Sequence, residues 1–114
     1  MTWQIELSDE VADWYERLTV QGMAQADRVI GMLAEQGNLL RMPQSRAPGD
    51  GLFELRFTCE NVARRVTYTF EPERKVFTLT TFRKQRQNEQ REIDRARKAR
   101  GERRDRLPDP RTKG

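Results

Sequence analysis

Two kinds of hydrophobic periodicity follow one another at the start of the chain. Residues 3–7 alternate apolar and polar side chains, which predicts a short strand. Ser8 comes next and suits a helix N-cap. Apolar residues then recur at helical spacing over residues 11–18 and 23–33, and Gly37 suits the C-terminal cap of the second run. We therefore expect two consecutive helices that form an antiparallel pair.

A second region of the pattern predicts a sheet. Residues 42–51 contain two prolines and two glycines, so we expect a loop there. Three runs with period two follow, at residues 52–58, 62–70 and 76–82, and hairpin-length links separate them. From residue 87 the chain is helical in character but barely amphipathic. The predicted fold class is α+β: an antiparallel sheet, an N-terminal helical hairpin packed on one face, and a C-terminal helix.

Strand alternation also predicts which side chains share a face of this sheet. The side expected to meet the helices carries Phe53, Leu55, Phe57, Val66, Tyr68, Phe70, Phe77 and Leu79. The opposite, free side is expected to carry Glu54, Arg56, Arg65, Thr67, Thr69, Thr78, Thr80, Phe82 and Lys84. Three strands thus direct a cation to one face, which suits a phosphodiester backbone. The alternative is an ordinary solvent-facing sheet surface.

Charge is concentrated near the C-terminal end. The chain has 114 residues and a net charge of +4, which fits one domain. Residues 1–82 hold 9 basic and 12 acidic side chains, whereas residues 83–106 hold 11 basic and 5 acidic ones. A local basic patch is typical of a protein that binds a polyanion, although a solvated basic helix has the same pattern. The candidate RNA-binding residues are Arg83, Arg86, Arg91, Arg95 and Lys98. We expect a folded domain over residues 1–100 and a basic, disordered tail over residues 101–114.

Composition also excludes several kinds of chemistry. There is no histidine, so a histidine general base or acid is excluded. Cys59 is the single cysteine, which excludes an intrachain disulfide and a structural zinc site. We find no glycine-rich phosphate loop and no carboxylate cluster, so we expect neither a metal nor an organic cofactor. With no apolar run long enough for a membrane span and no signal peptide, we expect a soluble cytoplasmic protein.

Four short motifs, taken in order, resemble one known family. They are Gly-Leu-Phe-Glu-Leu-Arg at residues 51–56, Arg-Val-Thr-Tyr at 65–68, Leu-Thr-Thr-Phe-Arg-Lys-Gln at 79–85, and a helix with Glu92-Ile93 and Ala96. Each motif is weak alone, but the ordered set is similar to RelE/HigB toxins of type II toxin–antitoxin systems. The nearest resemblance is to the phage-derived, host-inhibition-like HigB branch, and it covers roughly residues 3–100.

The resemblance implies a fold, an activity and partners. The fold would be the small RelE-like α/β fold, and the activity would be ribosome-dependent cleavage of messenger RNA without metal or cofactor. The RNA would supply its own 2′-hydroxyl as the nucleophile. The partners would be mRNA, the ribosome with its 16S rRNA at the decoding site, and a HigA-like helix-turn-helix antitoxin that represses the promoter together with the toxin.

The resemblance also implies roles for individual residues. Arg56 and Arg65 match the strand arginines that hold the phosphate, and Lys84 matches the basic group near the leaving 5′-oxygen, with Arg83 and Arg86 beside it. The general base is not identified, and Glu54 qualifies only if its pKa is raised. Two alternatives remain: a non-catalytic module that binds RNA or ribosome, and an inactive corepressor paired with an antitoxin.

Overall fold

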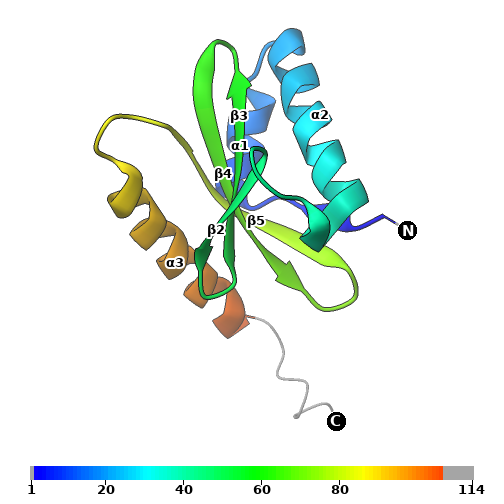
Figure 1. Cartoon of the computed structure of the whole chain (residues 1–114), viewed down its shortest axis with the longest axis vertical. Helices are drawn as coiled ribbons and strands as arrows, with labels where there is room; N and C mark the ends of the chain where they lie inside the picture. The colour runs from blue at the N-terminus through cyan, green and yellow to red at the C-terminus, as the bar shows by residue number, and fades with distance from the viewer. Residues whose placement is uncertain (1, 107–114) are drawn as a thin grey trace.

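The computed structural model describes residues 2–106, which form one five-stranded sheet and three α-helices (Figure 1). The elements in chain order are β1 (Gln4–Glu6), α1 (Asp9–Glu16), α2 (Val20–Gln36), the 3-10 helix η1 (Gly37–Leu39), β2 (Ser45–Gly49), β3 (Leu52–Cys59), β4 (Val62–Glu71), β5 (Lys75–Arg83) and α3 (Glu89–Arg106). The expected α+β class is confirmed. Ser8 caps α1 by accepting a hydrogen bond from the Val11 amide, and Gly37 ends α2 with a positive φ.

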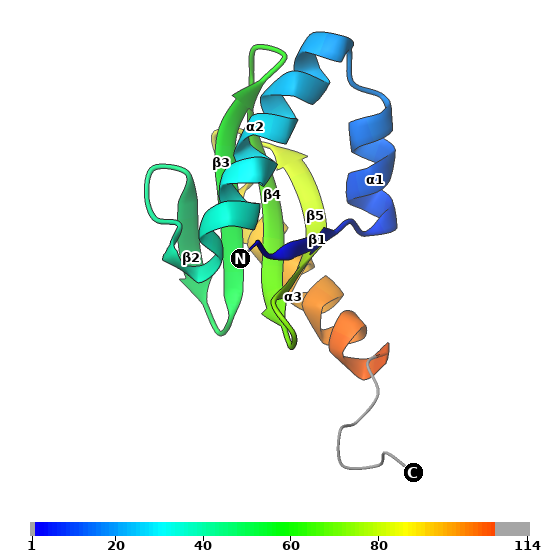
Figure 2. The same cartoon turned by 90° about the vertical axis from the view of Figure 1, so that its right-hand side faces the viewer.

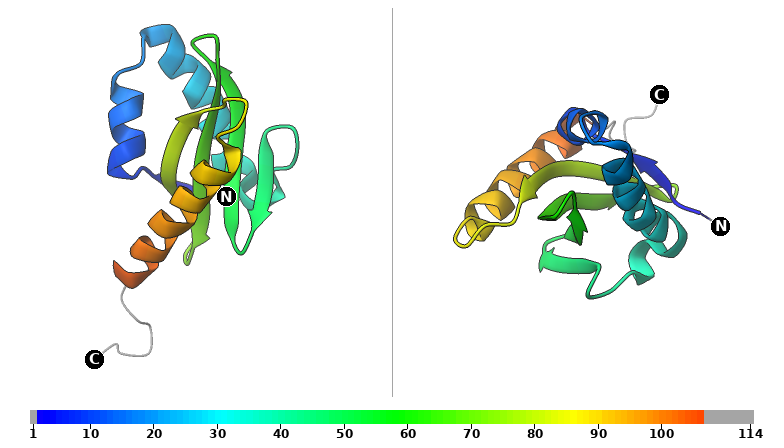
Figure 3. Two further views of the ribbon diagram at one scale, coloured as in Figure 1. Left: turned by 90° about the vertical axis from the view of Figure 1, so that its left-hand side faces the viewer. Right: turned by 90° about the horizontal axis from the view of Figure 1, so that it is seen from above.

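The strands lie in the order β1-β5-β4-β3-β2. Neighbouring strands from β2 to β5 are antiparallel, whereas β1 pairs with β5 in parallel. Figure 2 views the sheet from the side of α1 and α2, and the left panel of Figure 3 shows α3 in front of the opposite face. Helices therefore cover both faces, and the face that we expected to be free is partly covered by α3.

Two expectations about local structure are wrong. The predicted loop at residues 42–51 contains β2, an edge strand that tolerates Pro48 because its pairing shifts register between Arg46 and Gly49. The predicted tail begins at residue 101, but α3 continues through Arg106. Residues 107–114 of that predicted tail lie outside the described residues, and the boundary of the domain stays a prediction.

The larger core lies between the sheet and the helical hairpin. Its buried members are Val11, Val29, Leu33, Leu40, Leu55, Val66, Tyr68 and Val76. Aromatic rings extend it along the strands, since Phe53 stacks on Tyr68 with ring centroids 5.5 Å apart. The buried Tyr68 hydroxyl is 2.6 Å from the Ser45 hydroxyl of β2, which joins this core to the edge strand.

A smaller core lies under α3. It shows that the prediction for the first part of β5, in which Phe77 and Leu79 face the helical hairpin, is wrong. Phe77 and Leu79 pack here with Leu52, Ile93 and Ala96 rather than against the hairpin. The strand register is the reason, because Thr78 pairs with Tyr68 and so faces the hairpin, where Ser8 donates to its hydroxyl.

A bulge in β5 then restores the predicted side for the rest of that strand. Between the pairs Tyr68–Thr78 and Val66–Thr81, β5 has two residues where β4 has only Thr67. The Thr80 hydroxyl is 2.6 Å from that of Thr67, on the face opposite the hairpin. Thr80 and Phe82 therefore lie on the same face of the sheet as Thr67 and Arg65, as predicted.

Candidate functional site

Strand register gathers charged side chains on the α3 face of the sheet. Arg46 of β2 lies opposite Glu54 of β3, and Arg56 of β3 lies opposite Arg65 of β4. Residues that pair across antiparallel strands share a face, so these side chains are neighbours. Lys84 follows β5 and its amide donates to the Ala63 carbonyl, which continues the β4–β5 pairing by one residue.

Glu54 is the centre of this cluster and has no exposed surface. Its Oε1 atom lies 3.7 Å from Arg46 Nη1, 3.9 Å from Arg56 Nε and 3.7 Å from Arg65 Nε. These are ion-pair distances rather than hydrogen bonds, and neither Glu54 oxygen has a hydrogen-bond donor among the described residues. Three guanidinium groups therefore surround one buried carboxyl group that none of them binds closely.

Glu89, the first residue of α3, links Lys84 to the cluster. Its Oε2 atom lies 2.8 Å from Lys84 Nζ, and its Oε1 atom lies 3.0 Å from Arg46 Nη1. The buried Asn88 side chain fixes the segment between β5 and α3, since it accepts from the Gln85 amide and donates to the Arg83 carbonyl. This clamp holds Lys84 and Glu89 side by side.

Glu54 and Glu89 lie side by side, but their surroundings shift their pKa values in opposite directions. Burial, the largest cause, and the adjacent Glu89 together raise the pKa of Glu54 to about 7, although Arg46 and Arg65 act in the opposite direction. Burial also opposes ionisation of Glu89, but hydrogen bonds from Lys84 and from protonated Glu54 outweigh it and leave the pKa of Glu89 below its usual value. A group titrating near neutrality beside an ionised one is an arrangement suited to proton transfer.

The cations respond to the same environment. Burial lowers the pKa of Arg65, and the neighbouring Arg56 lowers it further by repulsion. An arginine nevertheless remains charged at neutral pH because its usual pKa is so high. The cluster thus presents positive charge from several elements at one place, which suits an anionic ligand with several oxygens.

The predicted site residues differ in how the structure uses them. Arg56, Arg65 and Lys84 are brought together around Glu54 and Glu89. Arg83, Arg86, Arg91 and Lys98 are exposed, and Arg86 and Arg91 border one shallow hollow beside Asn88. The roles proposed for all of these residues stay predictions.

Arg95, a predicted RNA-binding residue, forms ion pairs with one carboxylate of α1 and one of α3, and its RNA-binding role stays a prediction. Its guanidinium donates to both carboxylate oxygens of Glu10 at 2.6 and 2.9 Å and to Glu92 at 2.9 Å. These hydrogen bonds, that to Glu10 above all, raise the pKa of Arg95. The sequence could not show this, because Glu10 lies 85 positions away.

Two members of the cluster were missed by the sequence-based list of site residues. Arg46 belongs to the segment predicted as a loop, so no strand register could be assigned to it. Glu89 lies after the last strand, so strand alternation assigned it to no face, and its contacts are with Arg46 and Lys84. Only the pairing of β2 with β3 and the start of α3 place both beside Glu54.

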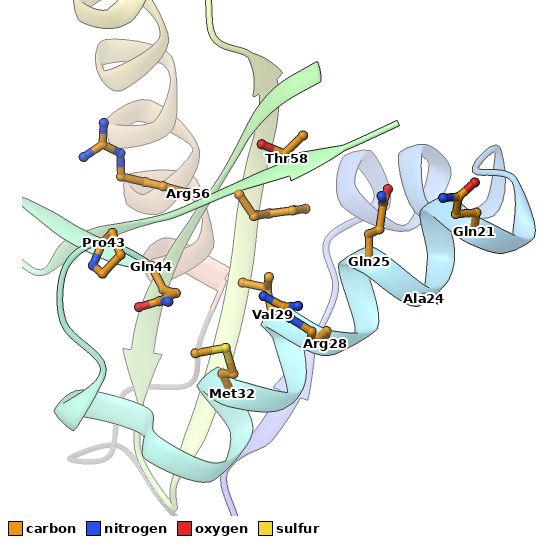
Figure 4. Close-up of a pocket in the computed structure, with 11 residues that line it drawn as sticks. Gln21, Ala24, Gln25, Arg28, Val29, Met32, Pro43, Gln44, Arg56 and Thr58 are labelled. Carbon is orange, nitrogen blue, oxygen red and sulfur yellow. The ribbon is translucent and has the colours of Figure 1, made fainter. Parts of the chain in front are cut away.

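A groove with a volume of about 500 Å³ lies on the hairpin side, between α2 and β3 (Figure 4). Val29, Met32 and Phe57 contribute apolar lining and Arg28 contributes charge, whereas the Arg56 side chain points away from the groove in Figure 4. No carboxylate is among its lining residues. The groove therefore offers no acid–base pair, and the charged cluster is the better candidate for chemistry.

Within residues 2–106, no group of three or more histidine, cysteine, aspartate or glutamate side chains is placed to hold a metal ion. No helix of this part of the chain has the length and apolar character needed to cross a membrane.

Comparison with known proteins supports a family assignment. The fold is similar to a solved structure of the E. coli toxin RelE, a double arginine-to-alanine mutant in the free state. The similarity has a TM-score of 0.59 at 11% sequence identity, and it covers 88% of this chain and 98% of that one. A search of curated protein sequences found no significant match. The model of the family described as Phage derived protein Gp49-like (DUF891) matches residues 13–101, and the chain belongs to that family.

Proposed function

We propose that this protein is the toxin of a type II toxin–antitoxin system, of the HigB branch, and that it cleaves messenger RNA on the ribosome. The observation that carries the proposal is the cluster itself: arginines from three strands surround a buried carboxyl group with a pKa of about 7, on a RelE-like fold. RNA carries its own nucleophile, so such a site needs only to position a phosphate, move protons and stabilise charge.

The proposed reaction is transesterification within the RNA. The 2′-oxygen forms a bond to the adjacent phosphorus while the bond from phosphorus to the 5′-oxygen breaks, which leaves a 2′,3′-cyclic phosphate and a 5′-hydroxyl. Glu54 takes the 2′-hydroxyl proton, and Lys84 gives a proton to the departing 5′-oxygen. Arg56 and Arg65 bind the phosphate oxygens as negative charge develops, because a guanidinium offers paired donors in a fixed plane.

Glu54 meets the requirements for the general base that the sequence left open. A pKa of about 7 leaves a useful fraction of the group ionised at neutral pH while keeping its affinity for a proton. Neither carboxyl oxygen is bound by a hydrogen-bond donor among the described residues, so a substrate hydroxyl that displaces the side chains covering Glu54 would find an acceptor there. The surrounding arginines moderate the pKa, since Arg46 and Arg65 both lower it.

The proposed partners follow from the same activity. Exposed Arg83, Arg86, Arg91 and Lys98 extend positive charge from Lys84 along α3, toward which mRNA and the 16S rRNA at the decoding site would be attracted. A HigA-like helix-turn-helix antitoxin would neutralise the toxin and bind the promoter with it. The cytoplasm is the compartment in which these partners meet.

Controlled expression in a bacterial host tests the nuclease. The wild-type chain should arrest growth, and primer extension should show new 5′ ends only within translated messages. Arg65→Ala should relieve the arrest and lower the cleavage rate by about 10²–10³, the usual loss for one charge-stabilising donor. Arg17→Ala is the matched control, because Arg17 is exposed on the hairpin side of the sheet and should leave cleavage unchanged. Full toxicity of the Arg65 variant would remove Arg65 from the active site.

The exposed cations of α3 favour a second candidate, a module that binds RNA or ribosome without cutting. In that case Arg91→Glu combined with Lys98→Glu would abolish function while Arg65→Ala would have little effect. Arg95 is unsuitable for this test because it anchors α3 to Glu10. A corepressor role would leave growth and message ends unaffected in every variant.

A further inference from the structure

One anionic side chain in the cluster spans two cations that belong to different elements. Arg46 lies on the edge strand β2, and Lys84 lies in the link after β5. The Glu89 carboxylate contacts one with each oxygen, at 3.0 Å to Arg46 Nη1 and 2.8 Å to Lys84 Nζ. An arginine and a lysine that converge on one pair of oxygens form the kind of site that also binds a phosphate group.

The three side chains reach solvent, unlike the carboxyl group beneath them. The exposed fractions are 42% for Arg46, 33% for Lys84 and 27% for Glu89, against 0% for Glu54. An incoming ligand therefore meets this trio first, and a side chain at the surface can turn outward with little loss of packing. An ion pair as exposed as that between Arg46 and Glu89 contributes only about 0–1 kcal/mol, so a ligand can compete for Arg46 first, whereas the Glu89 Oε2 atom that faces Lys84 is buried.

Charge also favours an external anion at this place. Arg46, Arg56, Arg65 and Lys84 bring four positive charges to the cluster, and ionised Glu54 and Glu89 bring two negative ones. If Glu89 turns away, Arg46 retains only a 3.7 Å contact with Glu54, and Lys84 loses its contact with the carboxylate. A phosphate with more oxygens and at least equal charge would restore both contacts.

We propose that Arg46 and Lys84 form a phosphate-binding subsite for the RNA backbone, and that the Glu89 carboxylate fills this subsite until RNA displaces it. The proposal rests on the proposed function for the identity of the ligand, but it assigns a binding role to Arg46 and an occluding role to Glu89. Displacement of Glu89 also frees Lys84 for its contact with the leaving oxygen and removes a like charge from Glu54. The free protein is thus partly closed by its own side chain.

A binding measurement with an uncleavable ligand tests the subsite directly. The probe is a fluorescently labelled single-stranded RNA hexamer with 2′-O-methyl groups at every position, and the readout is fluorescence anisotropy at low salt. Glu89→Gln should bind this RNA about five- to tenfold more tightly than the wild-type protein, since a competing carboxylate is removed. Glu92→Gln is the matched control, because it makes the same charge change one turn along α3, where its partner is Arg95.

A second substitution identifies the subsite itself. Arg46→Ala added to Glu89→Gln should abolish the gain, and Arg46→Ala alone should weaken RNA binding. Equal gains from Glu89→Gln and Glu92→Gln would mean that only the general field changed and would overturn the proposal, as would a gain that survives loss of Arg46. Circular dichroism melts of each variant confirm that the fold is intact.

The outcome is separable from that of the proposed function. Cleavage by the wild-type chain together with equal binding of the Glu89 and Glu92 variants would retain the nuclease and reject the subsite. Tighter, Arg46-dependent binding by Glu89→Gln without cleavage of any message would retain the subsite and reject the nuclease.

Discussion

The two faces of the sheet are built from different interactions. The hairpin face packs Leu55, Val66, Tyr68 and Val76 against α1 and α2, and aromatic contacts continue along the strands. The α3 face has a small apolar patch at one end and the charged cluster at the other. A sheet that buries a large apolar core on one face can place buried charge on the other, because the smaller core there contributes less to folding.

Helix α3 shows the same division within one element. Ile93 and Ala96 are its buried side chains, and arginines form hydrogen bonds from the helix to the sheet and to α1. Arg95 bonds Glu10, Arg100 bonds the Thr69 hydroxyl, and Arg103 bonds both Glu71 and Glu6. Part of the positive charge that suggests a nucleic-acid ligand is therefore used to attach the helix.

The largest expected effect on stability comes from truncating the hairpin face. Leu55→Ala should lower the free energy of unfolding by about 2–5 kcal/mol, because Leu55 is fully buried in the larger core and its removal leaves a cavity. Urea denaturation measures this change. Leu39→Ala is the control, because Leu39 is 69% exposed and its truncation should change stability little. A small effect of Leu55→Ala would show that this face does not carry the fold.

Removing the Glu54 charge on the α3 face of the sheet should lower activity. Glu54→Gln should lower the cleavage rate by at least about 100-fold, the usual contribution of a general base. The wild-type kcat/KM, which reports the free protein, should rise with pH through about 7 as Glu54 ionises, and the variant should lose this rise. Rates on a ribosome-bound message across pH 5.5–8.5 test both points. An unchanged profile in the variant would assign proton transfer to another group.

The same residue should make stability depend on pH. Glu54 has a pKa of about 7 in the fold against 4.5 as its ordinary value, so the native state holds more protons than the unfolded state between these pH values. The Glu54 contribution to the free energy of unfolding should therefore fall as pH rises from about 4.5 to 7, with a slope approaching about 1.4 kcal/mol per pH unit. Glu54→Gln should remove that slope. The lowered pKa of Glu89 acts below this window and in the opposite direction.

The smallest expected effect concerns the attachment of α3. A double-mutant cycle with Glu10→Gln and Arg95→Met should give a coupling of about 0.2–1 kcal/mol, because both side chains are more than a third exposed. The coupling should shrink as salt rises from 50 to 500 mM, since screening weakens exposed ion pairs. Coupling that is insensitive to salt would show that apolar contacts hold the helix.

Local sequence was sufficient to predict several features. Alternation placed Glu54, Arg56 and Arg65 on one side and Leu55 and Val66 on the other, because side chains in a strand alternate by covalent geometry alone. Ser8 and Gly37 also marked helix ends correctly, because capping depends on the side chain and backbone of the residue itself. Hairpin-length links also predicted the antiparallel order of β3, β4 and β5.

Features that depend on distant partners were decided only by the tertiary structure. The pairing of β2 with β3 brings Arg46 to Glu54, and the β5 bulge lets Phe77 and Leu79 face α3 while Phe82 lies opposite Arg65. The raised pKa of Glu54 comes from burial beneath groups of three other elements, which no local pattern encodes. Chain geometry thus determined the sides taken by the residues of β3 and β4, whereas register, the β5 bulge and burial determined the sides taken in β5, which residues meet, and how strongly Glu54 holds a proton.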